Sequence, residues 1–193
     1  MNLTPELLLT AYSQGMFPMA HEDGQIYWYS PDPRAILPLD RLRTSRSLYR
    51  LIHSGKYAVS FDSVFTGVML ACAAPGPGRE TTWISDEIVE AYAVLHKLGF
   101  AHSVEVWSGE ELVGGLYGVS LRGLFAGESM FSVRPNTSKV ALYYLVRHLQ
   151  ARAYTLLDVQ FQTPHLARLG AIEVSLARYR DLLHQAMVVD AHF

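Results

Sequence analysis

The segment 156–161, Leu-Leu-Asp-Val-Gln-Phe, constrains the fold most, because it reads as a buried strand between two helices. Before it, the polar residues 136–138 can begin a helix, and apolar residues then recur at helical spacing. After it, Thr163 and Pro164 can cap and begin a short helix, which Gly170 can end. A helix–strand–helix unit of this kind predicts an α/β protein.

Two polar residues, Asp158 and Gln160, stand within this otherwise apolar strand. Side chains two apart on a strand point to the same face, so we expect these two to project together, opposite Leu157, Val159 and Phe161. A polar pair at the end of a strand in an α/β protein is a candidate for catalysis. The alternative is that nearby backbone amides satisfy both side chains.

The remaining elements follow from periodicity and from capping residues. We expect helices over 5–14, 45–54, 63–73 and 85–98 and from 178, and strands over 26–29, 35–39, 57–60, 101–107, 112–119, 123–131 and 172–174. The glycines at 114, 115, 118 and 127 predict either close backbone approach to a ligand or β-bulges.

The length of 193 residues fits one domain, or one domain with a small N-terminal lobe. The Pro- and Gly-rich run 74–80 is a candidate boundary or mobile loop, and the pattern changes to long strands near residue 100. We therefore expect an N-terminal lobe over 1–99 and a second domain over 100–193.

Cysteine content and hydropathy bear on the location of the protein. The single cysteine, Cys72, excludes an internal disulfide, and no apolar run reaches the length of a membrane span. The N-terminus lacks the basic start and apolar core of a signal peptide. These features predict a cytoplasmic protein.

The net charge of −2 hides a basic segment over 34–56, which contains six basic residues and one acid. Three of them, Arg43, Arg46 and Arg50, have the spacing of one helix face. This pattern predicts a local anionic partner, and the alternative is a solvated helix face.

Eight segments, in order along the chain from about residue 4 to 180, resemble the leucyl/phenylalanyl-tRNA–protein transferases. They are Gly-Met-Phe-Pro at 15–18, Trp-x-Ser-Pro-Asp-Pro-Arg at 28–34, Thr-Trp-Ile at 82–84, His-Ser-Val-Glu-Val-Trp at 102–107, Leu-Val-Gly-Gly-Leu-Tyr-Gly at 112–118, Gly-Glu-Ser-Met-Phe-Ser at 127–132, Leu-Asp-x-Gln at 157–160 and Pro-His-x6-Gly-Ala at 164–171.

The resemblance implies an enzyme of the N-end rule degradation pathway. Such enzymes move Leu, Phe or, less well, Met from aminoacyl-tRNA onto proteins whose N-terminal residue is Arg or Lys. The implied fold is a small N-terminal lobe packed on an acyl-CoA N-acyltransferase-like domain. The donor is already an activated ester, so we expect no cofactor and no metal.

The resemblance also implies roles for individual residues. Asp158 and Gln160 would be the catalytic pair, with Gln160 contacting the attacking amine and Asp158 orienting it. Glu128 would hold the cationic N-terminus of the acceptor, unless it is simply a buried, paired carboxylate. The basic segment would meet the tRNA backbone through its three arginines.

The matching positions for an apolar aminoacyl side-chain pocket are Leu116, Phe125, Leu142, Leu145 and Leu157, and core packing alone is the alternative for each. Trp83 matches an aromatic residue that stacks on the terminal adenosine of the tRNA. Met19 stands where better-known members carry a Trp beside that adenosine. The chain also lacks an N-terminal segment that is found in longer members.

Two other function classes compete with the resemblance. An acyl-CoA N-acyltransferase would cradle a pyrophosphate with a glycine-containing loop, but the matching run 133–139 has no glycine and contains Pro135. A non-catalytic RNA-binding module would leave Asp158, Gln160 and Glu128 unexplained. No Ser-His-Asp set is apparent, and the histidines lack partners at metal-ligand spacing.

Overall fold

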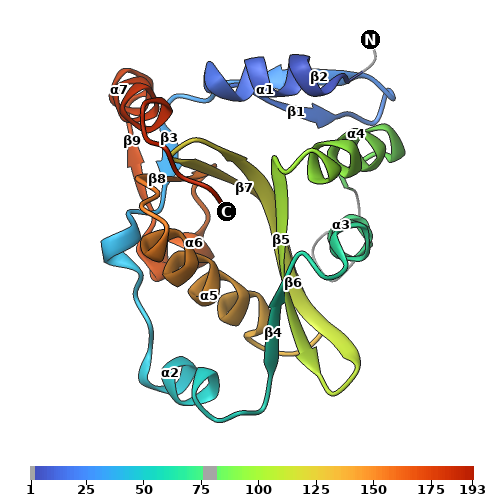
Figure 1. Cartoon of the computed structure of the whole chain (residues 1–193), viewed down its shortest axis with the longest axis vertical. Helices are drawn as coiled ribbons and strands as arrows, with labels where there is room; N and C mark the ends of the chain where they lie inside the picture. The colour runs from blue at the N-terminus through green and yellow to red at the C-terminus, as the bar shows by residue number, and fades with distance from the viewer. Residues whose placement is uncertain (1–2, 76–81) are drawn as a thin grey trace.

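The computed structural model describes residues 3–75 and 82–193 (Figure 1). Its centre is a seven-stranded mixed sheet in the order β4-β5-β6-β7-β8-β3-β9, with a separate ribbon of β1 and β2. Only β7 and β8 pair in parallel among these described strands. The strands are β1 Phe17–Ala20, β2 Ile26–Tyr29, β3 Arg34–Ile36, β4 Ala58–Phe61, β5 Ala101–Ser108, β6 Glu111–Leu121, β7 Leu124–Ser132, β8 Leu156–Gln160 and β9 Ile172–Val174.

Most of the helices begin at a side-chain cap. The helices are α1 Pro5–Ser13, α2 Arg46–Ile52, α3 Phe65–Ala73, α4 Asp86–Lys97, α5 Thr137–Ala151, α6 Pro164–Leu169 and α7 Leu176–Met187, with a 3-10 turn at Leu39–Arg41. The hydroxyl that precedes each of α1, α2, α4, α6 and α7 accepts a backbone N–H three residues on. The predicted helices and strands are therefore confirmed, with ends that differ by a few residues.

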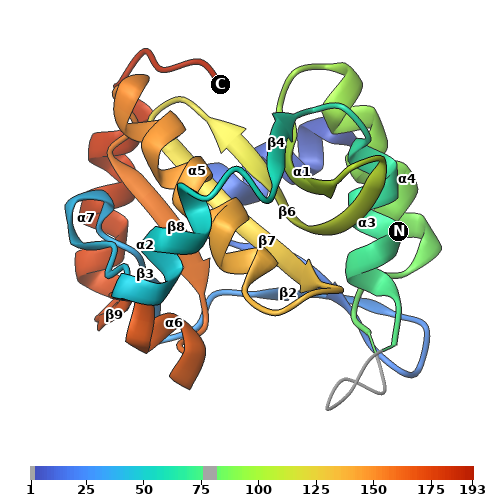
Figure 2. The same ribbon diagram turned by 90° about the horizontal axis from the view of Figure 1, so that it is seen from below.

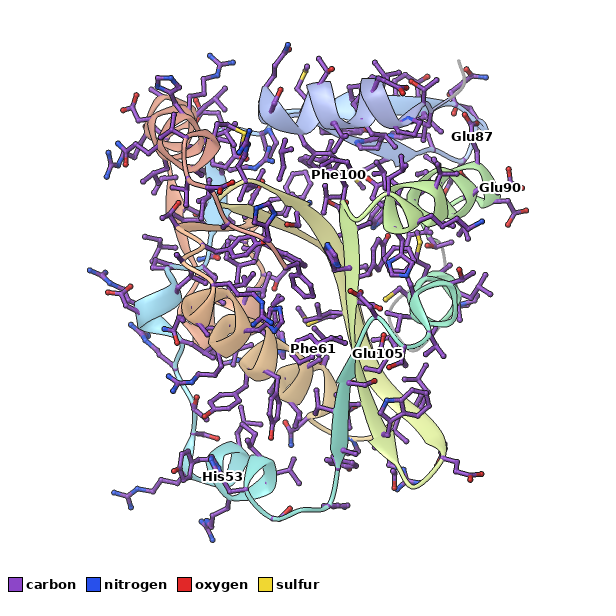
Figure 3. All side chains as sticks on the ribbon, viewed as in Figure 1. His53, Phe61, Glu87, Glu90, Phe100 and Glu105 are labelled. Atoms are coloured by element: carbon purple, nitrogen blue, oxygen red, sulfur yellow. The ribbon has the colours of Figure 1, made fainter. Side chains whose placement is uncertain are left out.

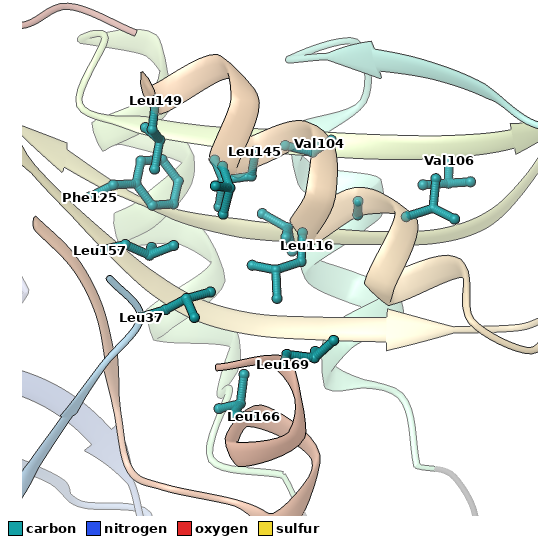
Figure 4. Close-up of a cluster of buried hydrophobic side chains, with 14 of the residues drawn as sticks. Leu37, Val104, Val106, Leu116, Phe125, Leu145, Leu149, Leu157, Leu166 and Leu169 are labelled. Atoms are coloured by element: carbon teal, nitrogen blue, oxygen red, sulfur yellow. The ribbon is translucent and has the colours of Figure 1, made fainter. Parts of the chain in front are cut away.

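Helix α5 covers one face of the sheet, and α2 and α6 extend this layer (Figures 1 and 2). Leucines of α5 and α6 meet strand residues of β5, β6, β7 and β8 in one apolar cluster (Figure 4). Burying this side of the sheet removes large apolar side chains from water, which is the main favourable term in folding.

The opposite face packs on α1, α3 and α4, and α7 covers the β7–β8–β3 end of the sheet. Both layers are visible in Figure 1, where α5 and the α3–α4 pair lie on opposite sides of the long strands. Within the described residues, no helix is both long and apolar enough to cross a membrane.

Two glycines of β6 explain why the sheet can be packed so closely. A Cβ on Gly114 would lie 2.5 Å from Cβ of Thr137, the first residue of α5. A Cβ on Gly118 would lie 2.4 Å from the ring of Phe125, and the β6–β7 register shifts at this point. The predicted β-bulge is confirmed at Gly118. At Gly114 the backbone of β6 closely approaches helix α5.

The α/β class is confirmed by this arrangement. Strands β3 and β4, which precede residue 100, belong to the same sheet as the strands that follow it. The division into a lobe over 1–99 and a domain over 100–193 stays a prediction. Residues 76–80 of the candidate boundary loop lie outside the described residues.

Candidate active site where β7 and β8 diverge

Strands β7 and β8 pair over only three positions, from Leu124–Leu156 to Ala126–Asp158. Beyond these pairs, the residues of the two strands border a cavity of about 290 Å³. Its lining residues are Phe17, Met19, Trp83, Leu116, Tyr117, Gly127, Glu128, Ser129, Met130, Leu142, Leu145, Leu157, Val159, Gln160, Phe161, Thr163, His165 and Leu166. A crevice at the carboxyl end of parallel strands is the usual ligand position in α/β sheets.

The end of β8 turns sharply at Gln160. This residue has φ of +59°, and the N–H of Phe161 donates to the carbonyl of Val159 at 2.7 Å, which closes a three-residue turn. As a result Gln160 lines the cavity together with Leu157, Val159 and Phe161. The left-handed backbone at Gln160 ends the regular strand at this residue, and the expectation that Asp158 and Gln160 project from one strand face stays a prediction.

Asp158 does not line the cavity, and both of its carboxylate oxygens accept hydrogen bonds from protein donors. Arg34 donates from Nε to Oδ1 at 2.9 Å and from Nη2 to Oδ2 at 2.6 Å. The hydroxyl of Tyr179 donates to Oδ2 at 2.8 Å, and the backbone N–H of Gln160 donates to Oδ1 at 2.9 Å. Asp158 thus holds the turn that positions Gln160.

Arg34 is completely buried, and its guanidinium lies between two aromatic rings. Its Cζ is 4.8 Å from the ring centroid of Phe17 and 4.5 Å from that of Tyr179, and Nη1 donates to the carbonyl of Gly15 at 3.1 Å. Burial alone would lower the pKa of Arg34, but the hydrogen bonds and charge of Asp158 outweigh it and raise this pKa. The pair is therefore charged and tightly held.

Glu128 contributes a carboxyl group to the cavity wall. Its Oε1 accepts from the hydroxyl of Tyr12 at 2.8 Å and from Nε2 of Gln160 at 2.9 Å, while Oε2 has no partner among the described residues. Burial raises the pKa of Glu128 from its usual value near 4.5 to about 8, against the lowering effect of the Tyr12 hydrogen bond. A carboxyl group with a free oxygen and this pKa can exchange a proton near neutral pH.

Buried tyrosines surround Glu128 on the side away from the cavity. The hydroxyls of Tyr12 and Tyr92 are hydrogen-bonded to each other, and the pKa of each is raised well above 10 by burial and then by the charge of Glu128. These tyrosines therefore act as neutral donors. Local sequence gives no signal of this cluster, because Glu128 lies 116 positions from Tyr12.

The apolar part of the cavity contains four of the five residues expected for the side-chain pocket. They are Leu116, Leu142, Leu145 and Leu157. The fifth, Phe125, does not line the cavity. It is fully buried and packs against Gly118 and on the ring of Phe193, with centroids 5.5 Å apart.

Trp83 and Met19 both line the cavity and are half-buried. The backbone of β1 is tied to this wall, because the N–H of Ala20 donates to the carbonyl of Trp83 at 3.1 Å. A Trp on the wall of a cavity of this kind offers an aromatic face on which a nucleobase can stack.

The three arginines of the basic segment do not share one helix face. Helix α2 begins at Arg46 with Ser45 as its cap, so Arg43 precedes the helix and the expected spacing fails there. Arg43 lines a second cavity, whereas Arg46 and Arg50 lie exposed one turn apart on α2. Helix α2 begins after Arg43 because the hydroxyl of Ser45 caps its first turn.

Two histidines, His102 and His165, carry imidazole rings of the kind that bind metal ions. His102 binds the carboxylate of Asp62 through Nδ1 at 2.7 Å, and His165 borders both cavities. Among the described residues, no group of three or more His, Cys, Asp or Glu is placed to hold a metal ion.

Comparisons with known proteins identify the family of the chain. The chain matches the family model of leucyl/phenylalanyl-tRNA protein transferase over residues 36–184 and the model of that family's N-terminal domain over residues 1–32. A leucyl/phenylalanyl-tRNA–protein transferase of Gluconobacter oxydans is 54% identical over 98% of this chain and 85% of the relative. One of Herpetosiphon aurantiacus is also 54% identical, over 99% of this chain and 98% of the relative.

A solved structure, L-PGS from Bacillus licheniformis, shares the fold with a TM-score of 0.51 and 14% identity, over 95% of this chain and 70% of that one. This likeness agrees with the expected α/β fold. Two family models that together span most of the chain, and relatives identical at half of its positions, establish that this chain belongs to the leucyl/phenylalanyl-tRNA–protein transferase family.

Proposed function

We propose that this chain transfers Leu or Phe, and less well Met, from aminoacyl-tRNA to the α-amino group of proteins that begin with Arg or Lys. The observation that carries the proposal is Glu128, a buried carboxyl with a free oxygen at a cavity whose other walls are mainly apolar. Transfer of an amino acid to an amine requires both a proton acceptor and a place for an apolar side chain.

Proton transfer is the first step that Glu128 can supply. An α-ammonium group has a pKa of about 8 in its free state. Burial raises the pKa of Glu128 to about 8, into the same range, so its carboxylate can accept a proton from the bound ammonium. The neutral amine then attacks the carbonyl carbon of the aminoacyl ester.

The tetrahedral intermediate collapses with cleavage of the bond between that carbon and the 3′-terminal ribose oxygen of the tRNA. The proton held by Glu128 passes to this leaving oxygen, and the second proton of the attacking nitrogen passes to the regenerated Glu128 carboxylate, so the step balances with no cofactor. The new peptide bond joins the amino acid to the acceptor. One carboxyl group therefore serves first as base and then as acid.

Gln160 and Asp158 position this chemistry. The Gln160 amide donates its N–H to Glu128, which leaves its carbonyl Oε1 to accept from the attacking amine. Asp158 holds the backbone N–H of Gln160 and is itself held by Arg34. We therefore assign Asp158 an orienting role, because its oxygens are used by protein donors and it does not line the cavity.

The donor fits the remaining walls. Leu116, Leu142, Leu145 and Leu157 would receive the side chain of the transferred amino acid. Trp83 and Met19 would contact the terminal adenosine, with Met19 packing on the base where a Trp would stack. The proposed acceptor and the proposed degradation pathway are those implied by the family. The single cysteine, Cys72, is buried, which suits a cytoplasmic enzyme.

The test is a transfer assay with two donors. Labelled Leu-tRNA with a peptide that begins with Arg should give labelled peptide, whereas acetyl-CoA with the same peptide should give none. A matched peptide that begins with Asp is the acceptor control. Acetyl transfer from acetyl-CoA without Leu transfer would overturn the proposal in favour of the acyl-CoA alternative.

A further inference from the structure

The loop that follows β8 forms the solvent-exposed rim of the active-site cavity. Of the described residues that line the cavity, only Phe161 and Thr163 are exposed, and both belong to this loop. Thr163 caps α6, because its hydroxyl accepts the backbone N–H of Leu166 at 3.1 Å. Phe161 is 45% exposed and directly follows Gln160. A large aromatic side chain therefore stands at the rim, next to the amide that we propose contacts the attacking amine.

The ring of Phe161 is held in place although nearly half of the residue is exposed. Its edge packs on Phe17 of β1, with ring centroids 5.8 Å apart and planes at 84°. The turn at the end of β8 fixes its backbone, since its N–H donates to the carbonyl of Val159 at 2.7 Å. The next side chain, Gln162, is half-buried and donates to the carbonyl of Ala171 at 3.2 Å. The exposed face of Phe161 is thus presented by a pinned loop, which lowers the entropy cost of binding to it.

The position of Phe161 distinguishes it from other exposed apolar side chains, which are common on protein surfaces. It belongs both to the surface and to the cavity wall. The acceptor of the proposed reaction is a protein, and a cavity of about 290 Å³ cannot enclose it, so the acceptor chain leaves over the rim. Consecutive Cα atoms are about 3.8 Å apart. The second residue of the acceptor therefore passes close to the neighbour of Gln160.

The chemistry of the rim favours an apolar second side chain. In an extended chain, successive side chains point to opposite sides, so the first and second side chains of the acceptor meet different walls. An apolar or aromatic side chain that covers Phe161 removes apolar surface of both partners from water. Of the described lining residues only Glu128 is acidic, and it is buried. The exposed acids Glu87 and Glu90 stand on α4 and do not line the cavity (Figure 3).

We propose that Phe161 forms a subsite for the second residue of the acceptor protein, and that this subsite favours a bulky apolar or aromatic side chain. The inference deepens the proposed function and rests on it. Phe161 takes no part in the chemistry, so its contribution is to the KM of the acceptor. A competing occupant of the same ring face is the terminal adenosine of the donor, because Phe17 shares β1 with Met19.

The experiment uses three acceptor peptides of equal length, which begin Arg-Phe-Gly, Arg-Gly-Phe and Arg-Gly-Gly, with Leu-tRNA as the donor. The proteins are wild type, Phe161→Ala, Phe161→Leu and Tyr27→Ala. Tyr27 is the matched control, an aromatic residue that is also 45% exposed but does not line the cavity. The quantity measured is kcat/KM for each peptide, divided by that for Arg-Gly-Gly. Differences in amine basicity between peptides cancel when this ratio is compared between proteins.

Wild type and Tyr27→Ala should prefer Arg-Phe-Gly by about threefold to tenfold, mainly through KM, and should show no preference for Arg-Gly-Phe. Phe161→Ala should bring the ratio for Arg-Phe-Gly close to unity, and Phe161→Leu should retain part of the preference. Thermal unfolding checks that both variants are folded.

An equal preference in wild type and Phe161→Ala would overturn the subsite, as would an equal preference for Phe in the third position or no preference in wild type. A higher KM for Leu-tRNA in Phe161→Ala, with unchanged peptide ratios, would assign the ring to the donor instead. Failure of wild type to transfer Leu to any of the three peptides would overturn the proposed function itself.

Discussion

Arg34 and Asp158, 124 positions apart in the chain, form a buried bidentate ion pair at the back of the candidate active site. The pair joins the start of β3 to the middle of β8 and also engages Tyr179. It explains why a charged residue can stand in the centre of the sheet, since each oxygen of Asp158 accepts two hydrogen bonds.

The first prediction follows from this pair. Asp158→Ala should lower the free energy of unfolding by about 3–5 kcal/mol, because it leaves the Arg34 charge buried without a partner. The double variant Arg34→Met with Asp158→Leu should recover much of that loss. Denaturant unfolding of wild type, both single variants and the double variant measures these differences. Equal stability of Asp158→Ala and wild type would contradict the assigned role of the pair.

The same variants address the reaction. Asp158→Ala should reduce transfer by about 10²-fold or more, through the turn at Gln160, whereas donor binding should change little. The double variant should recover stability more than transfer, since nothing then holds the backbone N–H of Gln160. Single-turnover transfer, measured where every variant is folded, checks this. Near-wild-type transfer by Asp158→Ala would remove Asp158 from the mechanism.

The second prediction concerns stability and pH. Because the pKa of Glu128 is about 8 in the folded protein and near 4.5 when unfolded, its protonation favours the folded state. That contribution is complete below pH 4.5, declines by up to about 1.4 kcal/mol per pH unit, and is absent above pH 8. Glu128→Gln should therefore gain in stability relative to wild type between pH 4.5 and pH 8.

Thermal unfolding over a pH series measures this difference. The control is Glu90→Gln on the exposed surface of α4, whose difference from wild type should stay small across the series. If the Glu128→Gln difference does not change with pH, Glu128 does not titrate in this range.

The third prediction concerns proton release. At pH 7 Glu128 is mostly protonated in the free enzyme, because burial raises its pKa to about 8. A bound α-ammonium group would stabilise the carboxylate, so binding of a peptide with N-terminal Arg should release a proton. Calorimetry in two buffers of different ionisation enthalpy measures it. Glu128→Gln should bind without release, and identical release by both proteins would show that another group is responsible.

The fourth prediction separates the side-chain pocket from the core behind it. Leu145→Ala, on the cavity wall, should reduce Leu transfer and favour the larger Phe, because it enlarges the pocket. Phe125→Ala, which is equally buried but outside the cavity, should cost about 3–5 kcal/mol of stability and leave the preference unchanged. Transfer from Leu-, Phe-, Met-, Ile- and Lys-charged tRNA measures this. Efficient use of Lys would contradict the apolar pocket.

The fifth prediction concerns Trp83. Trp83→Ala should raise KM for the donor by a factor equivalent to about 1–3 kcal/mol, the contribution of one base stacked on an aromatic ring. Trp83→Phe should recover part of this, and KM for the acceptor peptide should change little in either variant. An unchanged donor KM in Trp83→Ala would exclude stacking at this position.

Local sequence was sufficient to predict most of the secondary structure. The caps at Ser85 and Thr163 and the helix end at Gly170 act within a few residues, so the predicted helices appear in the structure. The order of motifs along the chain also indicated the family, because side-chain chemistry at fixed spacing does not depend on knowing the fold. Four of the five predicted pocket residues line the cavity for the same reason.

Tertiary structure alone decided the chemistry of the polar groups. Asp158 and Gln160 are two residues apart, yet Asp158 is bound by Arg34, whereas Gln160 lines the cavity and binds Glu128. Burial raises the pKa of Glu128, and the residues next to Glu128 in sequence do not indicate that it is buried. Partner choice and desolvation arise from contacts between distant segments, so the sequence determined which groups are present and the fold determined which of them can exchange a proton.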